Sequence, residues 1–234
     1  MGVVERSNKL SKHLLRDLER LKKEILNVGS MVEDATNKAI TSLVSRRLEL
    51  AREVIEGDGE IDRKELEVEE ECLKILALHQ PVAADLRFIV AAMKVNNDLE
   101  RMGDLAVNIA ERATYLSSHE PIPIPFDFMD MVKKVQIMVR ESLDSLVNRD
   151  GVLARSVCKK DNEIDRANRH MFAVLQKEMG ENPRIIERAI HILSASRYLE
   201  RIADHATNIA EDVVFMVEGE MIRHHFEDFA KSKE

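Results

Sequence analysis

The chain has 234 residues, with 35 basic and 43 acidic side chains, a net charge of −8 and a pI of about 5.6. This acidic balance argues against nucleic acid as the main partner, because phosphate binding needs a basic surface, and the sequence has no tryptophan for base stacking. No stretch resembles a signal peptide or approaches the roughly 18 apolar residues of a membrane span, so we expect a cytoplasmic protein.

The first half of the chain predicts three helices. Its apolar residues recur in alternating steps of four and three, which is typical of a heptad seam and predicts one long helix over about residues 5–55. The seam consists of Leu14, Leu18, Leu21, Ile25, Val28, Val32, Ala35 and Ala39. We expect Gly57-Asp58-Gly59 to end this helix, a second helix to cover about 60–79, and Pro81 to lie in the first turn of a third helix that runs to about residue 116. The start of the first helix, with Leu10, Leu14, Leu21 and Ile25, is a candidate docking surface.

The second half predicts three more helices, over about 128–157, 162–179 and 183–217. Asn182 before Pro183 is a favourable pair for the start of the last one. Between the halves, Pro121, Pro123 and Pro125 cannot continue a helix and indicate a stiff connector. Because the other connections are short, sequential helices should pack antiparallel. We therefore predict an all-α protein with two tandem antiparallel three-helix bundles, over residues 1–118 and 119–234.

An internal repeat supports this division. The segments Leu99–Glu111 and Leu199–Glu211 carry the same residue at nine of thirteen positions. An acidic hexad precedes each segment, at 58–63 and at 161–166, and a proline lies between hexad and segment in both halves. The same order of elements in both halves indicates two copies of one structural unit.

The repeated carboxylates are the candidate functional residues. A helix turns about 100° per residue, so acids four positions apart share one face, where they repel each other by a few tenths of a kcal/mol. A multivalent cation would offset that repulsion, and oxygen ligands suit Mg²⁺, Ca²⁺, Mn²⁺ or iron. We therefore predict two metal sites, one per repeat. The candidate ligands are Asp58, Asp62, Glu100, Asp104 and Asn108 in the first repeat, and Asp161, Asp165, Glu200, Asp204 and Asn208 in the second.

Simpler interpretations of these residues remain open at this point. The acids can form a solvated helix face, or Arg101 and Arg201 can neutralise them in salt bridges. His205 follows Asp204 and is a further candidate ligand, although the first repeat has Leu105 there. The two cysteines, Cys72 and Cys158, lie in apolar patterns at positions that do not match between the repeats, and we expect both to be reduced core residues.

At these residues the chain resembles the PhoU family, the phosphate-uptake regulators of bacteria and some archaea. The resemblance covers both halves and rests on the two segments of the form LERxxDxAxNIAE, on the acidic hexads and on residues 80–87, QPVAADLR. It implies two similar three-helix bundles. It also implies metal binding through the acidic pairs named above, with iron first and magnesium, manganese, calcium or zinc as alternatives.

The resemblance implies a regulatory role without catalysis. A family member would act in the cytoplasm as an adaptor between the ATPase subunit of a phosphate ABC transporter and a sensor histidine kinase, damp phosphate-starvation signalling, and form a homodimer. One alternative is a carboxylate-bridged metal-dependent enzyme, but ferritin-like di-iron sites need Glu-x-x-His, and Gly103 and Ala203 occupy the third position after Glu100 and Glu200. The other alternative is a purely structural helical scaffold.

Overall fold

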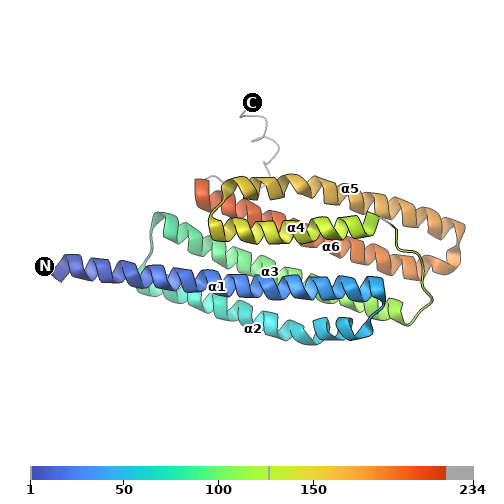
Figure 1. Ribbon diagram of the computed structural model, residues 1–234, viewed down its shortest axis with the longest axis horizontal. Helices are drawn as coiled ribbons and strands as arrows, with labels where there is room; N and C mark the ends of the chain where they lie inside the picture. The colour runs from blue at the N-terminus through green and yellow to red at the C-terminus, as the bar shows by residue number, and fades with distance from the viewer. Residues whose placement is uncertain (1, 126, 220–234) are drawn as a thin grey trace, which may run out of the picture.

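The computed structural model describes residues 2–125 and 127–219, with side chains described for 12–125 and 128–219. Over these residues the protein consists of six α-helices and one short 3₁₀ turn, without a strand (Figure 1). The helices are α1 (Gly2–Ser45), α2 (Leu48–His79), α3 (Ala83–Ser117), α4 (Asp127–Asn148), α5 (Gly151–Glu181) and α6 (Ile186–Glu218), and the 3₁₀ turn is Pro183–Ile185. The predicted all-α class is therefore confirmed. None of the described helices contains an apolar stretch long enough to cross a membrane.

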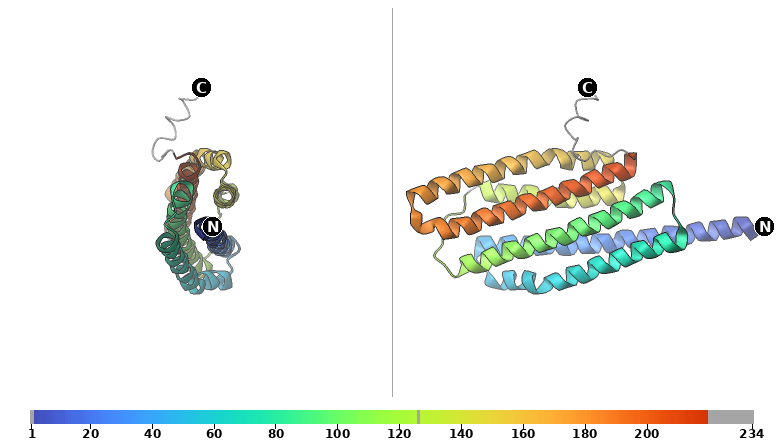
Figure 2. Two further views of the ribbon diagram at one scale, coloured as in Figure 1. Left: turned by 90° about the vertical axis from the view of Figure 1, so that its left-hand side faces the viewer. Right: turned by 180° about the vertical axis from the view of Figure 1, so that it is seen from behind.

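The six helices form two three-helix bundles that lie side by side (Figure 1). Seen from the end, α2, α3, α6 and α5 follow an arc, and α1 and α4 lie on the inner side of that arc (Figure 2, left). The outer side is formed by α2, α3, α6 and α5 (Figure 2, right), and we call it the four-helix face. Within each bundle consecutive helices run antiparallel, as the short connections predict.

The heptad seam of α1 forms much of the core of the first bundle. Its members Leu18, Leu21, Ile25, Val28, Val32 and Ala39 are buried, and Leu14 and Ala35 are partly buried. Full burial of one such leucine or isoleucine side chain contributes about 1.5–3 kcal/mol. The suggested docking surface at the start of the first helix is therefore wrong for Leu21 and Ile25, which are core residues, and the side chain of Leu10 lies outside the described ones.

The first two helices meet at a two-residue turn, Arg46-Arg47. Arg46 has a positive φ of 55°, and its guanidinium donates to the backbone oxygens of Ser117, at 3.1 Å, and His119, just after α3. The second repeat has the same turn, with Arg149 at φ 53° and Asp150 as the N-cap of α5. Arginine is not a usual residue for this backbone conformation, so the first turn was hard to predict from the sequence, whereas Asp150-Gly151 was a usable signal for the second.

The predicted helix break at Gly57-Asp58-Gly59 is wrong, because these residues lie inside α2. A glycine in a helix costs about 1 kcal/mol relative to alanine, and α2 offsets this cost by burying Val54, Ile61, Val68 and Ile75, one every seven residues, on both sides of the glycines. The expected boundaries at 157 and 162 in the second half are wrong in the same way, since α4 ends at Asn148 and α5 begins at Gly151. Each acidic hexad therefore lies within a helix and not at its start.

The last helix of each repeat begins close to its predicted position. Pro81 precedes α3, which starts at Ala83, so its expected place in the first helical turn is not observed. Asn182 caps the 3₁₀ turn that leads into α6, and its side chain accepts a hydrogen bond of 3.2 Å from the backbone nitrogen of Arg184. The predicted pairing of Asn182 with Pro183 as a helix start is confirmed.

The two bundles contact each other mainly through α3 and α6. Arg87 donates to the backbone oxygen of Met216 at 3.1 Å, and further along α3 Asp98 lies 2.7 Å from His205. Residue numbers rise along one helix as they fall along the other, so α3 and α6 are antiparallel. This is the arrangement expected if a twofold axis relates the two repeats.

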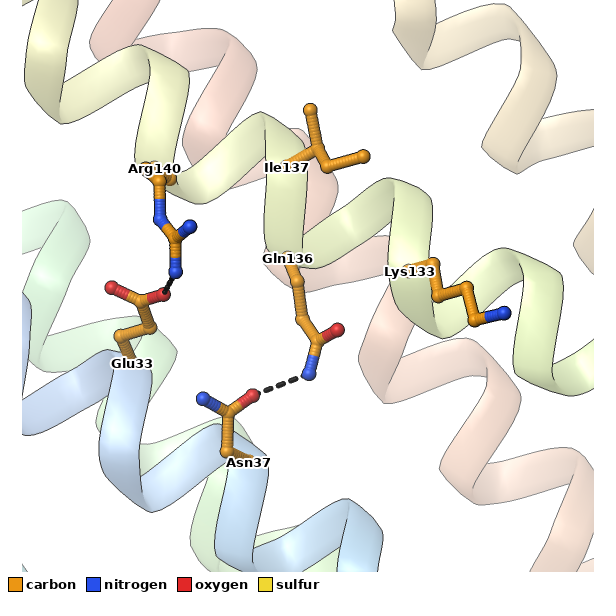
Figure 3. A pocket seen from close by; sticks show the side chains of 6 residues that line it. All are labelled: Glu33, Asn37, Lys133, Gln136, Ile137 and Arg140. Atoms are coloured by element: carbon orange, nitrogen blue, oxygen red, sulfur yellow. Dashed lines mark hydrogen bonds and ion pairs between the residues drawn. The ribbon is translucent and has the colours of Figure 1, made fainter.

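A second contact between the bundles joins α1 to α4. Arg140 pairs with Glu33 at 2.6 Å, and Gln136 donates to Asn37 (Figure 3). Gly29 permits a close approach here, because a Cβ at this position would lie only 2.6 Å from Cδ1 of Leu143. The two contacts together fix the relative position of the bundles.

Candidate functional site: two acidic helix seams

The register of α2 places acids where a helix seam would normally carry apolar residues. Ala51, Asp58, Glu65 and Cys72 recur every seven residues, and Ala51 and Cys72 are fully buried. Asp58 and Glu65 therefore occupy seam positions of α2 and are turned toward α3. The corresponding series in α5 is Ala154, Asp161, Asn168 and Leu175. The same periodicity that buries the apolar side chains thus positions the acids.

The first acidic cluster consists of Asp58, Asp62 and Glu65 on α2 with Glu100 and Asp104 on α3. Asp58 lies against α3 at Gly103, since a Cβ at Gly103 would be in ordinary van der Waals contact with Asp58 Oδ1, at 3.6 Å. Asn96 of α3 donates to the carboxylate of Glu65 at 3.1 Å. The structure brings together the four predicted carboxylates of this repeat and adds Glu65, which the sequence analysis did not identify.

The acids of the first acidic cluster raise one another's pKa values. Burial raises the pKa of Asp58, and the negative charges of Asp62 and Asp104 raise it further. Burial likewise raises the pKa of Glu100, with Asp104 the largest charge contribution. Burial also raises the pKa of Glu65. A protonated carboxyl or a bound cation would relieve this repulsion.

Arg101 neutralises the first acidic cluster in part. Its guanidinium lies 3.4 Å from Oε2 of Glu100 and 3.5 Å from Oδ2 of Asp104, and the Arg101 side chain is exposed. The salt-bridge alternative is thus realised on one side of the cluster. Oε2 of Glu100 is nevertheless buried and receives no hydrogen bond among the described residues. A buried carboxylate oxygen in this state is available to an additional ligand.

The second acidic cluster consists of Asp161 and Asp165 on α5 with Glu200 and Asp204 on α6. Thr207 of α6 donates to Oδ1 of Asp161 at 3.1 Å, which joins the two helices at this point. Burial raises the pKa of Asp204 to about 6, and the negative charges of Glu200, Asp161 and Asp165 contribute further. The Asp204 side chain remains exposed on one side, so solvent screens part of this repulsion.

Asn208 and His205 lie in the interface between the bundles. His205 Nδ1 is 2.7 Å from Oδ1 of Asp98, and Asn208 Nδ2 donates to the same oxygen at 3.3 Å. The sequence analysis did not identify Asp98, although a lone acid within the apolar pattern around Leu99 was a usable signal. Asn108, the equivalent of Asn208 on α3, is half-buried. Asp98 therefore links α6 to α3 beside the second acidic cluster.

The donor set of both clusters fits a hard cation. Each cluster offers carboxylate oxygens from two helices, which are the ligands that Mg²⁺, Ca²⁺, Mn²⁺ and iron favour. Within the described ranges, however, no three Asp, Glu, His or Cys side chains converge closely enough to hold an ion as they lie. Metal binding would therefore require carboxylate side chains to rotate within each cluster.

Both acidic clusters open onto the four-helix face. The acidic clusters lie on α2 and α3 in the first bundle and on α5 and α6 in the second. The remaining helix of each bundle, α1 or α4, lies on the inner side of those two helices (Figure 2). The partly exposed carboxylates of α2 with α3, and of α5 with α6, must therefore face outward. The molecule presents two related acidic seams on one surface.

Tandem three-helix bundles, each with an acidic seam, define a helical repeat protein whose halves present related surfaces. The family model for the PhoU domain matches this chain twice, over residues 25–113 and 128–213. The chain belongs to the PhoU family, and the resemblance described above is confirmed.

Similar proteins cover nearly the whole chain. The phosphate-specific transport system accessory protein PhoU homolog of Aquifex aeolicus is 40% identical over 90% of this chain and 96% of that protein. The homolog of the same name from Pseudomonas aeruginosa is 39% identical over 92% of this chain and 89% of that protein.

Solved structures show the same architecture. The crystal structure of PhoU from Pseudomonas aeruginosa has a TM-score of 0.84 at 39% identity, and covers 88% of this chain and 99% of that one. The phosphate transport system regulatory protein PhoU from Streptococcus pneumoniae has a TM-score of 0.80 at 28% identity, and covers 89% of this chain and 98% of that one.

Proposed function

We propose that this protein is a cytoplasmic accessory regulator of phosphate transport, without catalytic activity of its own. One observation carries the proposal. Relatives of 39–40% identity, named as accessory proteins of the phosphate-specific transport system, match across 90–92% of the chain and therefore across both repeats. A match of this extent includes both acidic clusters and the interface between the bundles, so the whole molecule corresponds to these relatives.

The architecture supports an adaptor. Two related bundles that lie side by side offer two related surfaces, and one molecule can contact two partners through them. We propose that these partners are the ATPase subunit of a phosphate ABC transporter and a sensor histidine kinase, and that the protein acts as a homodimer. Its output is then a binding event that reports the state of the transporter to the kinase.

A metal would act in this proposal as a structural counter-charge. Asp58, Asp62, Glu100 and Asp104 would hold it in the first repeat, and Asp161, Asp165, Glu200 and Asp204 in the second. The bound cation would neutralise repelling carboxylates and alter the charge of the four-helix face. Iron is our first candidate, and magnesium, manganese, calcium and zinc are the others. Oε2 of Glu100, which is buried and receives no hydrogen bond among the described residues, supports this role.

The functional test is made in cells. A strain that lacks the protein should express phosphate-starvation genes even when phosphate is plentiful, and restoring the protein should repress them again. The measurement is a reporter for a starvation gene, combined with recovery of the transporter ATPase subunit and the kinase on the tagged protein from phosphate-replete cells. Normal repression in the deletion strain, together with failure to recover either partner, would contradict the proposal.

A further inference from the structure

An apolar groove lies between α5 and α6, outside the second acidic cluster. It has a volume of about 360 Å³ and is open to solvent. We call it the α5–α6 groove, and it is lined by Asn168, Arg169, Phe172, Ile190, Leu193, Ser194 and Arg197. The side chains of Phe172 and Ile190 are 55% and 51% exposed. Two large apolar side chains exposed together in a concave surface are typical of a binding site.

The exposed apolar residues of α6 have counterparts in the first repeat. Ile186 and Ile190 are 41% and 51% exposed, and the equivalent residues Leu86 and Val90 of α3 are 39% and 36% exposed. Both copies of the repeat thus leave the same two apolar positions uncovered. The exposure of these two positions is therefore a property of the repeated unit and not of one helix alone.

The charge at the edge of the groove is what distinguishes the second repeat from the first. Arg169 and Arg197 flank the apolar residues of the α5–α6 groove. The Arg169 side chain is 70% exposed, and its ion pair with Asp165 is a long one of 3.9 Å, without a hydrogen bond. In the first repeat the equivalent positions hold Leu66 and Asn97. At these equivalent positions, within the described residues, the second repeat combines exposed apolar side chains with two arginines and the first does not.

We propose that the α5–α6 groove binds an acidic amphipathic helix of the transporter partner. An apolar stripe at positions i, i+3 or i+4 and i+7 of that helix would contact Phe172 and Ile190, as in other helix-in-groove complexes. Acidic side chains beside the stripe would pair with Arg169 and Arg197, since arginine favours bidentate contact with carboxylates. The identity of the partner rests on the function proposed above, whereas the chemistry of the occupant follows from the groove itself.

The test uses the full-length protein and two kinds of probe. The first probe is the purified phosphate ABC transporter complex. The second is a pair of synthetic amphipathic helices with a leucine stripe. Glutamates flank the stripe in one, the glutamate peptide, and lysines flank it in the other, the lysine peptide. Two double variants are compared with the wild type. The apolar double variant is Phe172→Glu with Ile190→Glu, and the arginine double variant is Arg169→Glu with Arg197→Glu. The matched control is Val82→Glu with Val152→Glu, which adds the same charge at residues 75% and 82% exposed outside the groove.

If the groove binds an acidic helix, the affinities of the variants should differ in a specific way. The apolar double variant should bind the transporter and the glutamate peptide at least tenfold more weakly, while the control variant binds as the wild type does. The wild type should prefer the glutamate peptide over the lysine peptide by at least tenfold, and the arginine double variant should reverse that preference. Circular dichroism and thermal unfolding of each variant show whether its fold is retained.

The remaining outcomes separate this proposal from the proposed function. If the transporter binds the wild type and the groove variants equally, the groove proposal fails and the function stands. If the wild type prefers the glutamate peptide but does not bind the transporter, the groove chemistry stands and the assigned partner fails. Absence of a peptide preference overturns the acidic-helix occupant. A changed sedimentation coefficient of the groove variants alone would make the groove a contact between copies of this chain and would also overturn it.

Discussion

At the scale of single residues, the clusters depend on acids at seam positions. Asp58 and Asp161 occupy places where α2 and α5 would otherwise bury an apolar side chain, and burial raises the pKa of each. Partial desolvation disfavours the charged form, and neighbouring carboxylates add to the effect. The protein retains this unfavourable arrangement in both repeats, which is the observation that most favours a cation or a proton as a regular occupant.

Asp204 gives a prediction for the pH dependence of stability. Its pKa is raised to about 6 in the folded protein from an ordinary value of 3.8, so the folded state binds its proton more tightly than the unfolded chain does. The free energy of unfolding should therefore rise as pH falls from about 7 toward 4. Asp204→Asn should stabilise the protein at pH 7.5 by about 1 kcal/mol, since solvent screens this exposed group, and should give no gain at pH 4.5.

The measurement for Asp204→Asn is urea denaturation of both proteins at the two pH values, in the presence of a chelator. The difference in unfolding free energy between the variant and the wild type reports on the Asp204 carboxylate alone. Burial lowers the pKa of His191, which makes stability fall as pH falls, but this contribution is the same in both proteins. An equal stability difference at pH 4.5 and pH 7.5 would contradict the assignment.

At the scale of secondary-structure elements, the continuity of α2 and α5 is the main correction to the sequence analysis. The helices pass through the acidic hexads, so Asp58 and Asp62, and likewise Asp161 and Asp165, lie one helical turn apart on one face. Had a break occurred at Gly57-Asp58-Gly59, the direction of Asp58 relative to α3 would have depended on a turn. The uninterrupted helix fixes it.

Glycine substitutions test this continuity. A Cβ at Gly57 or Gly59 would have no heavy atom within 4 Å, and both residues are helical. We therefore expect Gly57→Ala and Gly59→Ala each to raise the free energy of unfolding by about 0.5–1 kcal/mol. Gly29→Ala is the contrasting control and should lower it, because buried Leu143 must move. Loss of stability in both α2 variants, measured by urea denaturation, would indicate a turn at this position.

At the scale of the whole molecule, the antiparallel contact of α3 with α6 places both acidic clusters on the four-helix face while keeping them on separate helix pairs. The repeats are not equivalent in detail. The first acidic cluster has five carboxylates and pairs with Arg101, whereas the second has four carboxylates, pairs with Arg169 and lies beside the α5–α6 groove. The two halves therefore present surfaces of different chemistry.

The separation of the clusters predicts independent metal sites. Glu100→Ala with Asp104→Ala should lower the metal content of protein purified without an affinity tag by about half. Glu200→Ala with Asp204→Ala should remove the other half. Both double variants should stay folded, because each removes two carboxylates that repel their acidic neighbours. Elemental analysis is the measurement, and Asp34→Ala with Asp130→Ala, exposed acids on α1 and α4, is the control. Unchanged metal content in the first variant would remove Glu100 and Asp104 from the set of ligands.

The sequence by itself determined the helical class, the internal repeat and the carboxylates of each repeat, because periodicity and spacing along a chain are local properties. It also contained the seven-residue series from Ala51 to Cys72, which was a usable signal for Glu65. Only the tertiary structure decided that the helices turn at Arg46 and Arg149 and that α3 packs against α6. It also decided that Asp98 meets His205 and that Phe172 stays exposed. These features depend on contacts between residues distant in sequence, where the burial gained by packing outweighs the local cost of glycine in a helix or arginine at positive φ.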